Sequence, residues 1–398
     1  MPPTGMSNMD SESLWNDETE PFSETEDDLP GLTNAIFQDA LVVSTDWTSE
    51  TLLSQIRRGN VELDPVFQRR DAWDRRKKSH FIESVIVGLP VPQIVLAERK
   101  GSRGSYLVLD GKQRLLTLMQ FANGDYRLSG LTLRTDLNRC GIDDLPADDR
   151  LALETQTIRT VVVRNWQREE FLYLVFLRLN TGSVSLSPQE LRQALHPGDF
   201  VRFVNTYTVE HLEFAQLLRR DKPDFRMRDV ELLVRYFALI EFLPNYNGNL
   251  KDLLDETCME LNRRWDSSAP AIHQQADSCL LAIQATTEIF GQNSFRRWNF
   301  GRYERPFNRA IFDVMTFYAR QADVRDEMLR RPDIVRSSFQ GLCEAQPRFI
   351  ESITTTTKST EAIFNRLSLW GNVLRENLAL PIEIPARATD GHIAYAAL

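Results

Sequence analysis

The chain has 398 residues, of which 42% are apolar and 26% are charged, a composition typical of a globular protein with two or three domains. No stretch approaches the roughly 18 consecutive apolar residues of a membrane helix, and the N-terminus lacks the features of a signal peptide. We therefore expect a cytoplasmic protein with no membrane partner. The chain has four widely separated cysteines, Cys140, Cys258, Cys279 and Cys343. Their spacing excludes a short-spaced zinc ribbon and argues against a disulfide scaffold.

Negative charge is concentrated at the N-terminus. The formal net charge is −9, but the first 56 residues hold twelve acidic residues and no lysine or arginine, so the remaining 44 acidic residues face 47 basic ones. The body of the chain is therefore slightly basic, and nucleotides or nucleic acid are not excluded as ligands. Residues 1–33 combine Ser, Asp, Glu, Pro and Gly with few apolar groups, which predicts a disordered acidic tail.

Residues 34–165 are predicted to form a domain of mixed α and β structure. Helical spacing of apolar residues, with a cap or a closing glycine, predicts helices at 48–59, 77–88, 113–124 and 145–154. Runs rich in β-branched residues predict strands at 92–98, 106–110 and 157–165. Gly/Ser turn residues separate the first two of these strands, which favours their pairing.

Residues 166–398 are predicted to be α-helical. Amphipathic runs predict helices at 168–180, 187–195, 199–220, 227–243, 249–265, 271–290, 307–321 and 359–378. Between two of them, residues 291–307 interleave aromatic residues with arginines. Two interpretations fit this run, namely a loop packed by its own aromatic side chains, which we favour, and a surface that stacks on single-stranded bases.

The clearest chemical motif lies at 106–118, where a strand ends at Asp110 and a helix follows almost at once. Such a turn directs backbone N–H groups and the positive end of a helix dipole at one place, and Gly111 has no Cβ to obstruct an anion. Gln113 and Arg114 would supply hydrogen-bond donors, while Asp110 could hold a metal ion or polarise water. The alternative is an ordinary Asp-Gly turn that caps a helix.

Further motifs flank this turn in one order along the chain. They are FQRRDAW at 67–73, ESVIVGLPVPQIVL at 83–96, DGKQRLLTL at 110–118, IRTVVV at 158–163 and FLRLNTGSVSLSPQELRQAL at 176–195. Over roughly residues 45–265 the chain resembles the N-terminal domain of GmrSD-type modification-dependent restriction systems, whose hallmark is a DGQQR motif. The resemblance implies an α+β fold, with a ParB/sulfiredoxin-like small mixed-sheet domain at 34–165 followed by an α-helical domain at 166–398.

The resemblance also implies a nucleotide site. Asp110, Gly111, Gln113 and Arg114 fall on the hallmark, and Lys112 replaces its usual glutamine. Asp110 and Arg114 would be catalytic, with Asp110 binding Mg²⁺. A nucleoside triphosphate of unspecified base would be bound by Gln68, Arg69, Trp73, Gly111, Lys112, Gln113, Asn180 and Thr181.

The residue types suit these roles. Arg69 and Arg114 can neutralise phosphates, Trp73 offers a stacking face, and Asn180 offers an amide at a helix end. An alternative for the RLNTG segment is a helix that ends at Gly182, followed by a cap at Ser187 and a proline in the first helical turn. For Lys112, a purely structural turn predicts a solvated side chain whose replacement by Gln is neutral or slightly stabilising.

Nuclease activity of the HNH type is not expected. The resemblance implies that family members which cut DNA by themselves carry a domain with closely placed histidines. The five histidines of this chain are scattered, namely His80, His196, His211, His273 and His392. We expect His80 and His211 to be surface or partly packed residues.

Three functions fit these features. The leading hypothesis is a nucleotide-binding and NTP-hydrolysing sensor or regulatory subunit of a bacterial DNA restriction or anti-phage defence system, with a separate nuclease subunit. The second is a non-catalytic DNA-binding or adaptor protein that uses the basic turn and the loop at 295–305. The third is a ParB-like nuclease acting through Asp110, which the single candidate carboxylate disfavours. DNA and a second copy of the chain are the further partners we expect.

Overall fold

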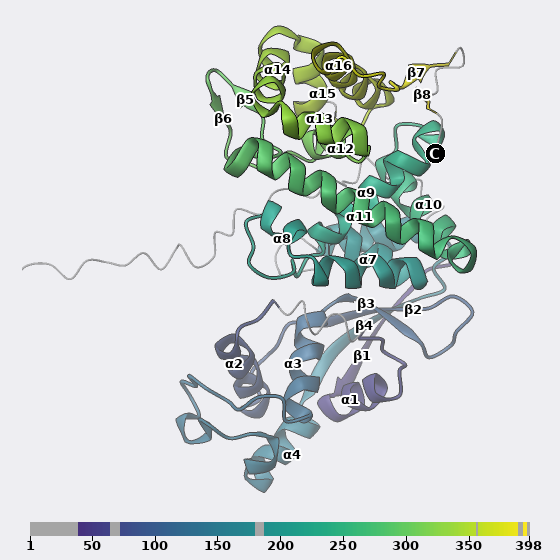
Figure 1. Cartoon of the computed structure of the whole chain (residues 1–398). Helices are drawn as coiled ribbons and strands as arrows, with labels where there is room; N and C mark the ends of the chain where they lie inside the picture. The colour runs from purple at the N-terminus through teal and green to yellow at the C-terminus, as the bar shows by residue number, and fades with distance from the viewer. Residues whose placement is uncertain (1–38, 64–71, 180–186, 356, 389–392, 396–398) are drawn as a thin grey trace, which may run out of the picture.

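The computed structural model describes residues 39–63, 72–179, 187–355, 357–388 and 393–395. A small sheet lies between helices on one face and a larger helical part on the other (Figure 1). The acidic tail predicted at 1–33 lies outside the described residues.

The sheet and its first helices come from the N-terminal part of the chain. The strands are β1 (Leu41–Thr48), β2 (Ile94–Glu98), β3 (Tyr106–Asp110) and β4 (Thr157–Arg164). The helices are α1 (Ser49–Arg57), α2 (Arg75–Ile86), α3 (Lys112–Ala122) and α4 (Ala147–Thr155), with short turns η4 (Thr135–Leu137) and η5 (Ile142–Asp144). The strand order is β1-β4-β2-β3, with β2 parallel to β4 and the other neighbours antiparallel. The predicted small mixed sheet and the pairing of β2 with β3 are confirmed.

Strand β1 was not predicted from the sequence. It pairs with β4 along its whole length, from Leu41 opposite Arg164 to Thr48 opposite Thr157. Its side chains are mostly exposed or half-buried, because it lies at the edge of the sheet. Such a strand is kept in place by backbone hydrogen bonds rather than by a row of buried apolar side chains. The spacing of apolar residues therefore does not predict it.

The helical part follows the sheet in sequence. Its helices are α5 (Glu169–Leu179), α6 (Pro188–Leu195), α7 (Asp199–Glu210), α8 (Glu213–Leu217), α9 (Arg228–Glu241), η6 (Leu243–Asn245), α10 (Leu250–Arg263), α11 (Trp265–Phe290), η7 (Gly291–Asn293), α12 (Arg309–Ala319), α13 (Ala322–Arg330), α14 (Pro332–Ala345), α15 (Pro347–Thr354) and α16 (Thr360–Leu378). Short strands form two antiparallel pairs, β5 (Trp298–Asn299) with β6 (Arg302–Tyr303) and β7 (Ala386–Arg387) with β8 (Ile393–Ala394). Within the described residues, no helix has the length and apolar character needed to span a bilayer.

The α-helical prediction for this part is confirmed, with two differences. The helix predicted at 199–220 is divided into α7 and α8, and α7 is capped at His211. Helices α13, α14 and α15 were not predicted. These helices are joined by very short connections, and prolines begin α14 and α15. The spacing of apolar residues in the sequence therefore does not show where one helix ends and the next begins.

Both faces of the sheet are buried. Ile94 and Val108 pack against the helices α1 to α4, while Val95 and Leu109 pack with residues of α5 and α6. Successive side chains of a strand point to opposite faces, so β3 is buried at every position. This placement brings Asp110, the last residue of β3, into the interior.

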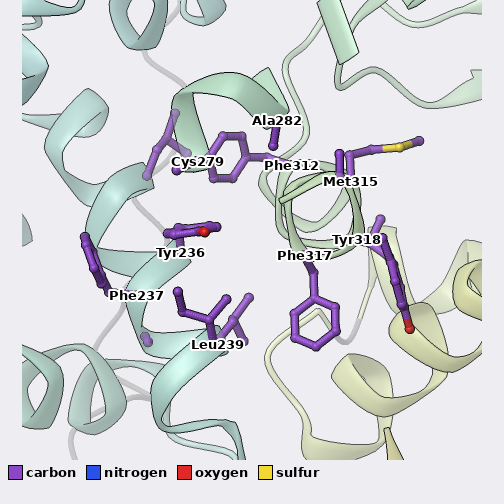
Figure 2. Close-up of a cluster of buried hydrophobic side chains, with 14 of the residues drawn as sticks. Tyr236, Phe237, Leu239, Cys279, Ala282, Phe312, Met315, Phe317 and Tyr318 are labelled. Carbon is purple, nitrogen blue, oxygen red and sulfur yellow. The ribbon is translucent and has the colours of Figure 1, made fainter. Parts of the chain in front are cut away.

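Helices α7 to α16 share one continuous apolar core, part of which is drawn in Figure 2. Side chains of α9, α11 and α12 meet there, among them Tyr236, Phe237, Cys279, Ala282, Phe312 and Met315. Burial raises the pKa of the Cys279 thiol well above its ordinary value, so this thiol stays protonated and unreactive. All four cysteines are free, with Cys140 half-buried and the others buried.

Glu83 on α2 anchors the loop between α3 and α4. Its buried carboxylate accepts hydrogen bonds from the backbone N–H groups of Arg134 at 2.7 Å, Leu133 at 2.8 Å and Thr132 at 3.1 Å. Burial by itself would raise the pKa of Glu83, but these N–H groups outweigh it and lower the pKa below its ordinary value. A carboxylate with a lowered folded-state pKa stabilises the fold above its unfolded pKa, and this stabilisation is lost as the pH falls through the folded pKa.

Glu83→Gln is therefore expected to lower the free energy of unfolding by about 1–3 kcal/mol near pH 7. The difference from the wild type should shrink as the pH falls through the lowered folded-state pKa of Glu83, because the wild-type side chain is then protonated also. Urea unfolding across this pH range measures both effects. Glu288→Gln, which alters an exposed carboxylate on α11, is the matched control and should change stability by less than about 0.5 kcal/mol.

Candidate functional site

The DGKQR turn at 110–114 joins the end of β3 to the start of α3. Gly111 caps α3 with a φ of 95°, in the left-handed region, and its carbonyl accepts a hydrogen bond from the N–H of Leu115 at 3.0 Å. A Cβ at this position would lie 2.9 Å from Cγ1 of Ile94. Both the φ and the close approach require glycine. The packing of the protein itself thus explains Gly111, before any ligand is considered.

Asp110 and Arg114 form a buried ion pair within this turn. The Asp110 Oδ1 accepts from the N–H of Gly111 at 2.6 Å, and its Oδ2 accepts from Nη2 of Arg114 at 3.1 Å. The same Nη2 donates to the carbonyl of Gln93 at 2.8 Å. The Nε of Arg114 is buried and has no hydrogen-bond partner among the described residues. One guanidinium donor is therefore left over in the interior beside Asp110.

Lys112 forms a second buried ion pair, with Glu190 on α6. Its Nζ lies 2.6 Å from Oε1 of Glu190, and the two side chains are 8% and 5% exposed. The expectation of a solvated Lys112 in a structural turn is wrong, because the packing of α6 against the sheet covers this side chain and supplies a counter-ion.

Glu190 was missed by the sequence analysis, although a local signal for it exists. Its Oε2 accepts from the N–H of Ser187 at 2.7 Å, while Oγ of Ser187 accepts from the N–H of Glu190 at 3.1 Å. These reciprocal bonds form a capping box, which the Ser-x-x-Glu spacing predicts. The predicted cap at Ser187 and the proline at the first position of α6 are confirmed.

Gln113 connects the turn to the upstream tryptophan motif. Its Oε1 accepts from the N–H of Ala72 at 3.3 Å, so the neighbouring Trp73 lies beside the turn. The Trp73 ring is half-buried and packs edge-to-face against Phe81, with 5.6 Å between ring centroids. Lys77 Nζ lies 5.2 Å from the centre of the Trp73 ring.

Four predicted binding residues lie outside the described residues, namely Gln68, Arg69, Asn180 and Thr181. The described residues that flank their two segments lie close to the turn. Ala72 follows the first segment and bonds Gln113, while Ser187 follows the second and bonds Glu190, the partner of Lys112.

A cavity of about 250 Å³ lies next to Lys112, between β3, α6 and α7. Its volume is just below the roughly 300–1,000 Å³ of small-molecule sites. Its lining consists of Glu62, Leu63, Arg99, Leu107, Val108, Lys112, Glu190, Gln193, Ala194, Pro197, Gly198, Val201 and Arg202. Asp110 and Arg114 do not line this cavity, so the side chains of the turn point to two different places. Lys112 faces the cavity, and the Asp110–Arg114 pair faces Gln93.

One part of the chain is similar to a known family. The model of the GmrSD restriction endonuclease N-terminal domain matches residues 49–197. This segment, called here the GmrSD-type domain, is similar to that family. The GmrSD-type domain extends from α1 through α6 and contains the DGKQR turn with both of its ion pairs. No curated protein and no solved structure matches the chain.

Helix α6 connects the GmrSD-type domain to the helices that follow it. Asp255 on α10 is buried, and its Oδ1 accepts from Nε of Arg192 on α6 at 2.7 Å and from the hydroxyl of Tyr173 at 3.2 Å. Its Oδ2 accepts from Nζ of Lys251 at 2.8 Å. The Nε2 of His196 lies 3.9 Å from Oδ1 of Asp255, and burial lowers the pKa of this imidazole. Sequence reasoning missed this cluster because Arg192 and Asp255 lie far apart in the chain.

His80 and His211 are partly packed, in agreement with the prediction that they are surface or partly packed residues. His80, beside the GmrSD-type domain's Glu83, is half-buried with its Nδ1 3.5 Å from that carboxylate. The His211 ring contacts the Tyr207 ring at a tilt of 38°, with 4.3 Å between ring centroids. Within the part of the chain that the structure describes, no three or more His, Cys, Asp or Glu residues are grouped in a way that could hold a metal ion.

Proposed function

We propose that this chain is a nucleotide-binding sensor or regulatory subunit of a bacterial restriction or anti-phage defence system, and that it hydrolyses a nucleoside triphosphate. The family match associates residues 49–197 with a restriction endonuclease domain. The nucleotide part rests on one observation, the convergence at the DGKQR turn. Residues that flank the two other motif segments bond directly to the turn or to the partner of its lysine.

The groups at the turn suit a phosphate. Lys112, Gln113 and Arg114 occupy the first turn of α3, where the helix dipole favours an anion. The buried Nε of Arg114 is a donor without a partner among the described residues, and a phosphate oxygen would satisfy it. A phosphate that displaces Glu190 from Lys112 would exchange one counter-ion for another, so the buried ammonium stays paired.

Asp110 fits the role of a single protein ligand to Mg²⁺. Magnesium in nucleotide sites is held by one or two carboxylates together with phosphate oxygens and water. Each carboxylate oxygen of Asp110 has one hydrogen-bonded neighbour and a further lone pair. When bound, the ion would neutralise charge on the phosphates. Asp110 would position it, while Arg114 donates to the phosphoryl group that is transferred to water.

Binding and hydrolysis by the purified full chain test this proposal. We expect fluorescent mant-ATP or mant-GTP to bind in the presence of Mg²⁺, and phosphate release to fall by about tenfold or more in Asp110→Asn, a loss of at least 1.4 kcal/mol in transition-state stabilisation. Asp144→Asn, which alters an exposed carboxylate on η5, should hydrolyse at the wild-type rate. Unfolding curves of both variants control for the structural role of Asp110. If the wild-type chain binds none of the magnesium complexes of ATP, GTP, CTP and UTP at about 1 mM, the proposal is contradicted.

The same preparation distinguishes the alternatives. We expect no DNA cleavage without a separate nuclease subunit. Cleavage of plasmid DNA that is lost in Asp110→Asn would favour a ParB-like nuclease. DNA affinity with a steep salt dependence and no hydrolysis would favour the adaptor, and light scattering of the full chain would reveal self-association.

A further inference from the structure

The β5–β6 hairpin lies at the outer edge of the helical part (Figure 1), outside the segment that matches the family model. Trp298 pairs with Tyr303 and Asn299 with Arg302, so Phe300 and Gly301 form a two-residue loop. Their φ values are 45° and 79°. Two positive φ values define a type I′ turn, in which Asn, Asp or Gly is the usual first residue.

Phe300 is an unusual residue for this position. A bulky L-residue in the left-handed region costs roughly 1–2 kcal/mol, and burial of the side chain is the usual compensation. Phe300 has none, because it is 97% exposed, more than any other large apolar residue in the described part of the chain. The protein thus holds a phenyl ring outward at a strained position, which is a sign of function rather than of stability.

The hairpin that carries Phe300 is firmly mounted on α14. Trp298 Nε1 donates to Oε1 of Glu344 at 2.6 Å, and the Tyr303 hydroxyl accepts from Gln340 at 3.3 Å. The Trp298 and Tyr303 rings also pack edge-to-face, with 4.9 Å between centroids. These contacts fix the base of the hairpin and therefore the direction of its tip.

The other phenylalanines of the 291–307 run face inward. Phe295 and Phe307 are buried and pack on each other and on Phe312. The favoured sequence interpretation, a loop packed by its own aromatic side chains, is confirmed for these rings. It does not account for Phe300.

Charge at the tip favours a polyanion. Arg302 and Arg305 are exposed, and neither has an ion-pair partner among the described residues. The acidic residue of the hairpin, Glu304, is already engaged by Arg297 and by the amide of Asn299. An exposed ring beside two available guanidinium groups is the combination that binds unpaired bases and their phosphates.

We propose that the β5–β6 hairpin is a nucleic-acid contact, in which Phe300 stacks on an unpaired base while Arg302 and Arg305 neutralise neighbouring phosphates. The contact is independent of the nucleotide site, because it uses no residue of the DGKQR turn. A protein partner is less favoured, because it would have to supply acidic side chains for both Arg302 and Arg305.

Fluorescence anisotropy with a labelled single-stranded DNA of about 20 nucleotides tests the contact in the full chain, with the matching duplex for comparison. We expect tighter binding to the single strand. Phe300→Ala should weaken it about 5- to 150-fold, the equivalent of one base stack of 1–3 kcal/mol, and Phe300→Trp should retain it. Replacing both Arg302 and Arg305 by Ala should reduce the slope of log K against log salt by about 1.4.

Two controls separate binding from folding. Phe300→Asn should lose the single strand but unfold at an equal or higher temperature, because Asn suits a type I′ turn. Arg348→Ala, an exposed arginine on the nearby α15, should bind as the wild type does. A wild-type chain that binds neither DNA, or a Phe300→Ala variant with unchanged affinity, overturns the proposal. So does an equal loss of affinity in Arg348→Ala.

Discussion

Replacing Asp255 by asparagine is expected to lower the free energy of unfolding by about 3–5 kcal/mol, the cost of breaking a buried ion pair from one side. The carboxylate is shared by Arg192, Lys251 and Tyr173 at 2.7–3.2 Å. Arg192 is fully buried, so its guanidinium would keep its charge and lose its counter-ion. Denaturant unfolding of the full chain at neutral pH measures the loss.

The pH dependence of this effect has a definite sign. Burial by itself would raise the pKa of Asp255, but Arg192 and Lys251 outweigh it and lower the pKa. Stabilisation by Asp255 is therefore present above the unfolded pKa of an aspartate, and it is lost as the pH falls through the lower folded pKa. The gap between wild type and Asp255→Asn should close in acid.

Asp252→Asn is the matched control, because it alters a carboxylate of the same helix. The Asp252 side chain is 44% exposed and lies 3.7 Å from Nζ of Lys251. A partly exposed pair of this kind contributes about 0–1 kcal/mol. Equal losses in the two variants would show that the buried cluster around Asp255 is not what joins α6 to α10.

Lys112→Gln is expected to lower the free energy of unfolding by about 3 kcal/mol, near the lower end of the range for a broken buried pair. The glutamine amide can still donate to Glu190, but it brings no charge to a carboxylate that is almost completely buried. A role as an exposed residue near a helix dipole predicts a neutral or slightly stabilising effect instead. The sign of the change therefore separates the two interpretations.

The double variant Lys112→Gln with Glu190→Gln isolates the pair itself. Because the two residues are in direct contact, we expect the double variant to be more stable than the sum of the single effects predicts, by about 0.5–3 kcal/mol. Additive effects would contradict the importance of the pair. Under the proposed function, Lys112→Gln should also weaken mant-nucleotide binding by about 1–3 kcal/mol, the range of a charge-assisted hydrogen bond. Unchanged affinity would count against Lys112 as a phosphate ligand.

Local features of the sequence determined the class of fold and the position of the central motif. The cap at Thr48, the cap and proline that begin α6, and the Gly/Ser turn between β2 and β3 all lie where they were predicted. The strand, turn and helix of 106–118 were predicted as well. Periodicity, capping and turn chemistry depend on residues a few positions apart, so a single sequence contains them.

Tertiary structure decided what surrounds each of these residues. The edge strand β1 is held by backbone pairing with β4, and Lys112 is buried because α6, 78 residues away, supplies Glu190. The outward direction of Phe300 follows from a hairpin mounted on α14. In each case the deciding partner is distant in the chain, and its approach depends on the packing of whole elements. Local spacing specifies which element forms, whereas burial, counter-ions and exposure arise only once the elements have packed together.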